Sequence, residues 1–168
     1  MKRISFFLIF TLYSYALQIH SIEADFIQSS KTQPIFYKGK FIASTPNLAR
    51  WEYIQPLRKD VYISPTQIIS YEPMLSQVII KKMSSTLDFI AILKNAKQDS
   101  KEPNLYHSII ENMHYAIYFK DQIPQRVEYQ DQLGESIVIE LKNVKLNVKV
   151  DKKDFEFVIP KGIDVIEQ

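Results

Sequence analysis

Apolar and polar residues alternate through most of the chain, the pattern of β-strands with one buried and one solvated face. In the first half of the chain, five alternating runs each end at a turn residue; they occupy positions 35–43, 50–54, 59–64, 67–71 and 77–83. The same period returns between positions 113 and 150, for example at Tyr115, Ile117 and Phe119. Short strands separated by turns predict an antiparallel meander of about ten strands.

Two other segments have a different spacing. Ile19, Ile22 and Phe26 fall on one helical stripe, which predicts a helix over positions 17–31 that ends before Pro34. Positions 105–112 have no clear period and are compatible with a short helix.

A further helix is predicted over positions 84–96. Ser85 and Asp88 have the Ser-x-x-Asp spacing of a capping box, which marks a helix start. The residues between 87 and 93 are apolar on nearly every side of such a helix. A helix of this kind is not a surface helix, so it needs a cover on both sides. One side can lie on the sheet, and the other requires another element or a ligand.

These elements predict a mainly β protein of the α+β class, built on a single large antiparallel sheet with two apolar helices. A sheet of about ten strands tends to curl or to close on itself. Two helices are too few to cover its inner face, so either the sheet closes or an apolar cavity remains. The 168 residues suit one domain with one core, and no repeat or linker divides them.

The first 16 residues are typical of a secretory signal peptide. Lys2 and Arg3 precede an apolar stretch at 4–12, and small residues at 14 and 16 predict cleavage near Ala16. An uncleaved anchor is the alternative, and the apolar stretch is short for a membrane span. The predicted mature domain is therefore 17–168. Loss of the two basic residues leaves 19 basic against 19 acidic residues, which gives no electrostatic case for nucleic acid.

Few residues are available for chemistry. The chain has no Cys, which excludes disulfides, thiolate metal sites, Cys nucleophiles and a lipid anchor on its own mature N-terminus. His107, Glu111 and His114 would align as metal ligands only on a helix, and the residues after Met113 have the period of a strand. No nucleophile motif is present, so we expect no enzyme, no metal and no cofactor.

The stretch 45–56 is the most distinctive motif, with Arg50 and Trp51 standing between Pro46 and Pro56. Further motifs follow in a fixed order: Phe26-Ile27-Gln28, Gly39 with Phe41, Tyr71-Glu72-Pro73 ahead of Gln77, and Phe155-Glu156-Phe157 ahead of Pro160-Lys161-Gly162. In order and spacing these motifs resemble the outer-membrane lipoprotein carrier (LolA) family. The resemblance covers essentially the whole chain after the predicted leader.

This resemblance implies a periplasmic chaperone that binds the acyl chains of lipoproteins and carries them to the outer membrane. It implies an unclosed β-barrel whose helices form a lid over an apolar cavity. The implied partners are acylated lipoproteins and an inner-membrane, ATP-driven complex that releases them. The resemblance does not decide whether an outer-membrane receptor is also a partner. We expect a monomer.

In such a carrier, acyl chains would lie between the sheet and the predicted helix. The candidate binding residues are Phe41, Trp51, Tyr53 and Tyr71 on the sheet, and Leu87, Phe89, Ile90 and Leu93 on the helix. Ordinary core packing is the alternative for each of them. The family often has a basic lid-latch residue just before the first proline of the stretch, where this chain has Thr45, so Arg50 is the candidate latch.

Two other classes of function remain open from the sequence. One is a periplasmic lipid- or glycolipid-binding protein or sensor on the same half-barrel, although 168 residues leave little room for the second domain of a sensor. The other is a structural or assembly protein that uses its sheet edges. Bound lipid in the purified protein would distinguish a carrier from the latter.

Overall fold

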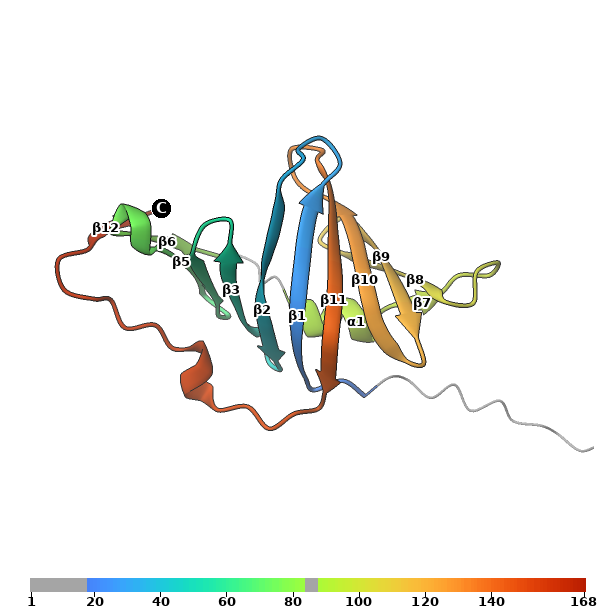
Figure 1. Ribbon diagram of the computed structural model, residues 1–168. Coiled ribbons are helices and arrows are strands. Elements are labelled where there is room, and N and C mark those ends of the chain that lie inside the picture. The colour runs from blue at the N-terminus through green and yellow to red at the C-terminus, as the bar shows by residue number, and fades with distance from the viewer. Residues whose placement is uncertain (1–17, 84–87) are drawn as a thin grey trace, which may run out of the picture.

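The computed structural model describes residues 18–83 and 88–168, which form one open twelve-stranded sheet (Figure 1). The strand order is β12-β6-β5-β4-β3-β2-β1-β11-β10-β9-β8-β7. All neighbours are antiparallel except β12 and β6, which are parallel. The strands are β1 (Ser21–Ser30), β2 (Phe36–Ser44), β3 (Leu48–Gln55), β4 (Lys59–Ile63), β5 (Gln67–Glu72), β6 (Gln77–Lys82), β7 (Lys97–Gln98), β8 (Leu105–Ile110), β9 (Met113–Lys120), β10 (Ile123–Gln130), β11 (Ser136–Leu146) and β12 (Asp164–Glu167).

The prediction of one large unclosed sheet is confirmed. The five runs of the first half of the chain correspond to β2 to β6, and the later alternation corresponds to β9, β10 and β11. Two-residue turns join β8 to β9 and β9 to β10, with positive φ angles at Glu111, Asn112, Asp121 and Gln122. Such angles fit the type of turn that matches the twist of paired antiparallel strands.

The predicted helix over 17–31 is wrong. Ser21–Ser30 forms β1, which lies in the middle of the sheet between β2 and β11. Ile22, Ala24 and Phe26 are buried at every second position, so the period of two also fits this segment. Because β1 pairs with a strand on each edge, its backbone N–H and C=O groups are hydrogen-bonded within the sheet. This pairing outweighs the preference for a helix that the spacing of the apolar residues indicated. The helical reading of 105–112 is also wrong, because Leu105–Ile110 forms β8.

The second predicted helix is present but shorter, as α1 (Phe89–Lys94). Asp88 caps it by accepting a hydrogen bond from the backbone N–H of Ala91 at 3.0 Å. Ser85, the other capping-box residue, lies outside the described residues. The predicted burial on both sides of this helix is confirmed, since four of its six residues are buried: Phe89, Ile90, Ile92 and Leu93. No helix within 18–83 and 88–168 has the length and apolar character needed to cross a membrane.

The sheet has two differently covered faces. The inner face packs against α1 and carries the main core, including Phe26, Phe41 and Trp51. The outer face of β3 to β5 is covered by the segment between β11 and β12, which contains the 3₁₀ turn Lys152–Phe155 (Figure 1). A second 3₁₀ turn, Pro73–Leu75, joins β5 to β6. The Phe155-Glu156-Phe157 motif lies at the end of the first 3₁₀ turn and just after it, and not in a strand.

Candidate functional site

An apolar cavity of about 400 Å³ lies between the inner face of the sheet and α1. Two of its walls come from α1 and β3, and most of the others come from β9, β10, β11 and the β10–β11 turn. The lining residues are Trp51, Phe89, Ile92, Met113, Tyr115, Val127, Tyr129, Asp131, Gln132, Leu133 and Ile139. Its size is within the range of pockets that bind small molecules, and its lining suits an apolar ligand.

Aromatic rings hold α1 against the sheet. The Phe89 ring lies 4.6 Å from that of Phe41 and 6.0 Å from that of Trp51. Behind them, the Phe26 ring contacts Trp51 edge to face at 4.9 Å. These rings form one continuous cluster at the base of the cavity, so a change in the position of α1 changes the surroundings of Trp51.

Three hydroxyl-bearing residues form a row across β8, β9 and β10, and two of them, Tyr115 and Tyr129, line the cavity. Ser108 pairs with Tyr115, and Tyr115 pairs with Tyr129. Tyr115 is 3% exposed, and neither its hydroxyl nor that of Ser108 has a hydrogen-bond partner among the residues that the structure describes. Burial, with a smaller contribution from the Tyr129 phenol, raises the pKa of Tyr115 to about 12. The Tyr115 hydroxyl is therefore neutral at physiological pH.

This unpaired hydroxyl predicts that Tyr115→Phe stabilises the ligand-free protein. An unsatisfied buried polar group costs about 1–3 kcal/mol, and phenylalanine keeps the ring without that group. The free energy of unfolding, measured by urea denaturation, is expected to rise by about 1 kcal/mol. Tyr53→Phe is the matched control, because the Tyr53 hydroxyl donates to Gln28 Oε1 at 2.9 Å and its loss is expected to destabilise. A loss of stability in Tyr115→Phe would contradict the prediction.

The structure brings some of the predicted site residues together. Trp51 and Phe89 line the cavity, and Phe41 packs directly on both of them. Tyr53 lines a neighbouring recess on the same face. Ile90 and Leu93 are buried on α1, which also packs against β8, but they are not among the lining residues. Leu87 lies outside the described residues.

Arg50 and Tyr71 are not brought to this site, because both lie on the outer face. Arg50 forms an ion pair with Asp60 at 3.2 Å, and its guanidinium lies 5.1 Å from the centre of the Tyr62 ring. The Tyr71 ring contacts that of Phe157 at 5.2 Å. Adjacent strand residues point to opposite faces, so Arg50 is turned away from the face that Trp51 occupies.

The walls contributed by β9, β10 and β11 were not predicted from the sequence. Tyr115 was predicted to lie on a buried face of a strand, but not at a cavity. The available signal was the alternation of apolar residues, which identifies a buried face and not the place where that face is left uncovered. Ile92 was also missed, although it lies on the predicted helix between residues that were named.

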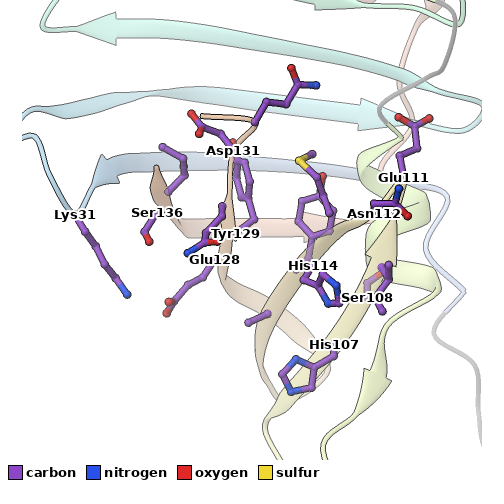
Figure 2. A pocket seen from close by; sticks show the side chains of 17 residues that line it. Lys31, His107, Ser108, Glu111, Asn112, His114, Glu128, Tyr129, Asp131 and Ser136 are labelled. Atoms are coloured by element: carbon purple, nitrogen blue, oxygen red, sulfur yellow. The ribbon is translucent and has the colours of Figure 1, made fainter. Parts of the chain in front are cut away.

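A second, more polar hollow of about 660 Å³ lies near the β8–β9 hairpin (Figure 2). Figure 2 shows His107 and His114 on neighbouring strands, with Glu111 at the far end of the hairpin. His107 pairs with Asp99 at 3.2 Å. Within 18–83 and 88–168, no three His, Cys, Asp or Glu residues are grouped to hold a metal ion. The helical spacing of the three candidate ligands has no counterpart in this hairpin.

Comparisons with known proteins agree with this geometry. The family model described as "Outer membrane lipoprotein carrier protein LolA" matches residues 18–111. A Helicobacter hepaticus protein named outer-membrane lipoprotein carrier protein is 36% identical over 161 residues, covering 94% of this chain and 89% of that protein. A protein of the same name from Wolinella succinogenes is 30% identical, covering 89% of this chain and 88% of that protein. An uncharacterized conserved protein from Thermus thermophilus has a similar fold, with a TM-score of 0.55, 14% identity, and coverage of 90% and 92%.

Proposed function

Since the chain belongs to the outer-membrane lipoprotein carrier (LolA) family, we propose that it binds the acyl chains of lipoproteins and carries them to the outer membrane. The observation that supports this proposal most directly is the apolar cavity between α1 and the inner face. Large uncovered apolar surfaces are rare in soluble proteins and usually mark a binding site for a ligand or a partner. Binding and release need no chemical step, so we infer a carrier and not an enzyme.

The proposal includes the surroundings in which the protein works. We infer that the leader is cleaved near Ala16 and that 17–168 acts in the periplasm as a monomer. Its cargo would be released to it by an inner-membrane, ATP-driven complex. These inferences rest on the signal-peptide pattern of the first 16 residues and on the family of the chain.

Energetics limit how much of the cargo the cavity can enclose. Each buried methylene contributes about 0.8 kcal/mol, so burying about forty of them would give about 32 kcal/mol. Reversible binding reaches only about 20 kcal/mol. A cavity of about 400 Å³ is consistent with partial shielding of the chains. Movement of α1 on loading would reduce the net affinity further, because its aromatic contacts with the sheet would be lost.

Release of a lipoprotein from spheroplasts tests the function. We expect the purified exported protein to transfer a tagged lipoprotein from the inner membrane into the medium as a soluble complex. The matched control is the same client with its acylated cysteine replaced, which cannot carry a lipid and should not form the complex. Retention of the acylated client in the membrane, despite folded carrier in the medium, would refute the proposed function.

A further inference from the structure

Several turns at one end of the strands, which we call the loop end, expose apolar side chains. The antiparallel registers place the turns at 31–35, 56–58, 73–76 and 131–135 at this end, together with the polar Glu111-Asn112 turn. Figure 1 shows the β1–β2 and β10–β11 turns side by side there. Every one of these four turns, or the strand residue next to it, exposes large apolar side chains: Ile35 (41%), Phe36 (59%), Leu57 (64%), Met74 (77%), Leu75 (63%) and Leu133 (89%).

The opposite end of the sheet differs. Its turns at 45–47, 64–66 and 121–122 contain none of the large apolar residues that are strongly exposed. They consist of Thr-Pro-Asn, Ser-Pro-Thr and Asp-Gln, which are ordinary turn residues. Turn geometry therefore does not require apolar side chains in this sheet. Those at the loop end are placed where they contribute nothing to the core.

The loop end also contributes to the walls of the cavity. Asp131, Gln132 and Leu133 belong to the β10–β11 turn and line the apolar cavity. A separate recess of about 340 Å³ on the inner face is lined by Tyr53 and Leu57, among others. One of the turns that expose apolar side chains to solvent thus lines the cavity, and a second lines the recess on the same face.

We propose that the loop end inserts its apolar side chains into the lipid surface of a membrane, so that acyl chains pass directly between bilayer and cavity. This proposal rests on the proposed function and specifies where the cargo is exchanged. Single apolar side chains on separate turns can enter the interfacial region of a bilayer together, with their backbones remaining among the headgroups.

The charges at the loop end favour a lipid surface over a charged protein partner. Lys31 and Arg58 are balanced by the acidic residues of the β10–β11 turn. The Asp131 carboxylate accepts hydrogen bonds from the backbone N–H groups of Leu133 and Glu135. The Glu135 carboxylate accepts from the hydroxyls of Ser30 and Thr32. Both carboxylates are thereby held within the loop end, and the four turns that expose apolar side chains together carry two basic and two acidic residues. Such a balance gives little electrostatic steering toward a charged protein partner.

Site-specific labelling tests the proposal, because the chain has no native Cys. Leu133→Cys and the control Val158→Cys, which is 84% exposed on the outer-face segment, would each carry an environment-sensitive fluorophore. The probe membrane is a vesicle of phosphatidylethanolamine with a minor share of phosphatidylglycerol. We expect a blue shift and brighter emission at 133 on vesicle addition, and no change at 158. Equal responses at the two positions, or none at 133, would overturn the proposal.

Vesicle flotation with the double variant Phe36→Ser/Met74→Ser gives a second measurement, because both side chains are exposed at the loop end and neither lines the cavity. We expect membrane partitioning to fall about a hundredfold, since each of the two large side chains entering the apolar region contributes about tenfold. The matched double variant Val158→Ser/Val165→Ser should partition like the original protein. Unchanged partitioning of the first variant, or binding that requires membrane proteins in the vesicle, would overturn the lipid assignment.

Binding of a fluorescent fatty acid in solution separates this proposal from the function on which it rests. A protein that binds the fatty acid but not the vesicles would retain the carrier function and lose the membrane-insertion proposal. A protein that binds neither would lose both. The Phe36→Ser/Met74→Ser variant should keep fatty-acid binding within about threefold, because neither residue lines the cavity or the recess beside it.

Discussion

Gly39→Ala is expected to destabilise the protein by more than about 3 kcal/mol, at the upper end of what overpacking usually costs. A Cβ at position 39 would lie 1.9 Å from the backbone carbonyl oxygen of Glu52 and 2.8 Å from Cε1 of Phe26. The carbonyl belongs to β3 and the ring to β1, and both strands are paired on both edges. The register between β2 and β3 shifts at Lys38 and Gly39, so the two backbones approach closely where only glycine fits. Urea denaturation followed by far-ultraviolet circular dichroism would measure the loss.

Gly134→Ala is the matched control for this clash. Nothing lies within 4 Å of the added Cβ, and the only cost arises from the positive φ of 81°. That strain amounts to about 1–2 kcal/mol for a residue with a side chain. Equal stabilities of the two alanine variants would show that β3 can move away from β2, and that the close approach is not needed for the sheet.

Local patterns predicted most of the strands whose neighbours in sequence are also their neighbours in the sheet, with β8 as an exception. The runs that became β2 to β6 form a meander, so alternation and turn residues together specify both strands and pairing. β1 pairs with β11 through residues more than a hundred positions apart, such as Phe26 with Leu141. The local sequence does not indicate a strand partner so far along the chain. The helical spacing of Ile19, Ile22 and Phe26 therefore led to a wrong prediction of a helix for this segment.

For the candidate site, the sequence predicts only which residues of one strand share a face of the sheet. Alternation shows that Arg50 and Trp51 face opposite ways, and this would have been enough to remove Arg50 from the inner face. Tyr71 is different, because its face depends on the registers of β3, β4 and β5. The covering of the outer face by Phe155 and Phe157 depends on the path of the C-terminal segment. Sequence periodicity carries no information about that path.

Phe89→Asp is expected to release α1 from the sheet and to abolish most acyl binding. Phe89 is 8% exposed, and its ring packs against Phe41 and Trp51. An unpaired carboxylate at that position would cost several kcal/mol. The helix has six residues and no stability of its own, whereas the sheet is held by pairing along eleven strand interfaces. Undocking of α1 is therefore cheaper than unfolding, and the cavity loses one wall.

Two measurements follow this change independently. Emission of Trp51, the one tryptophan of the chain, should shift to longer wavelength as water reaches its ring. Affinity for a fluorescent fatty acid should fall at least about a hundredfold, equivalent to about 3 kcal/mol. Lys94→Ser is the control, because Lys94 is exposed on the same helix, and it should change neither signal. Asp88 still caps the helix in both variants, so a difference between them cannot arise from loss of the helix start. If Phe89→Asp binds the fatty acid as tightly as the original protein, α1 is not a wall that the ligand needs, and the cargo must lie elsewhere on the inner face.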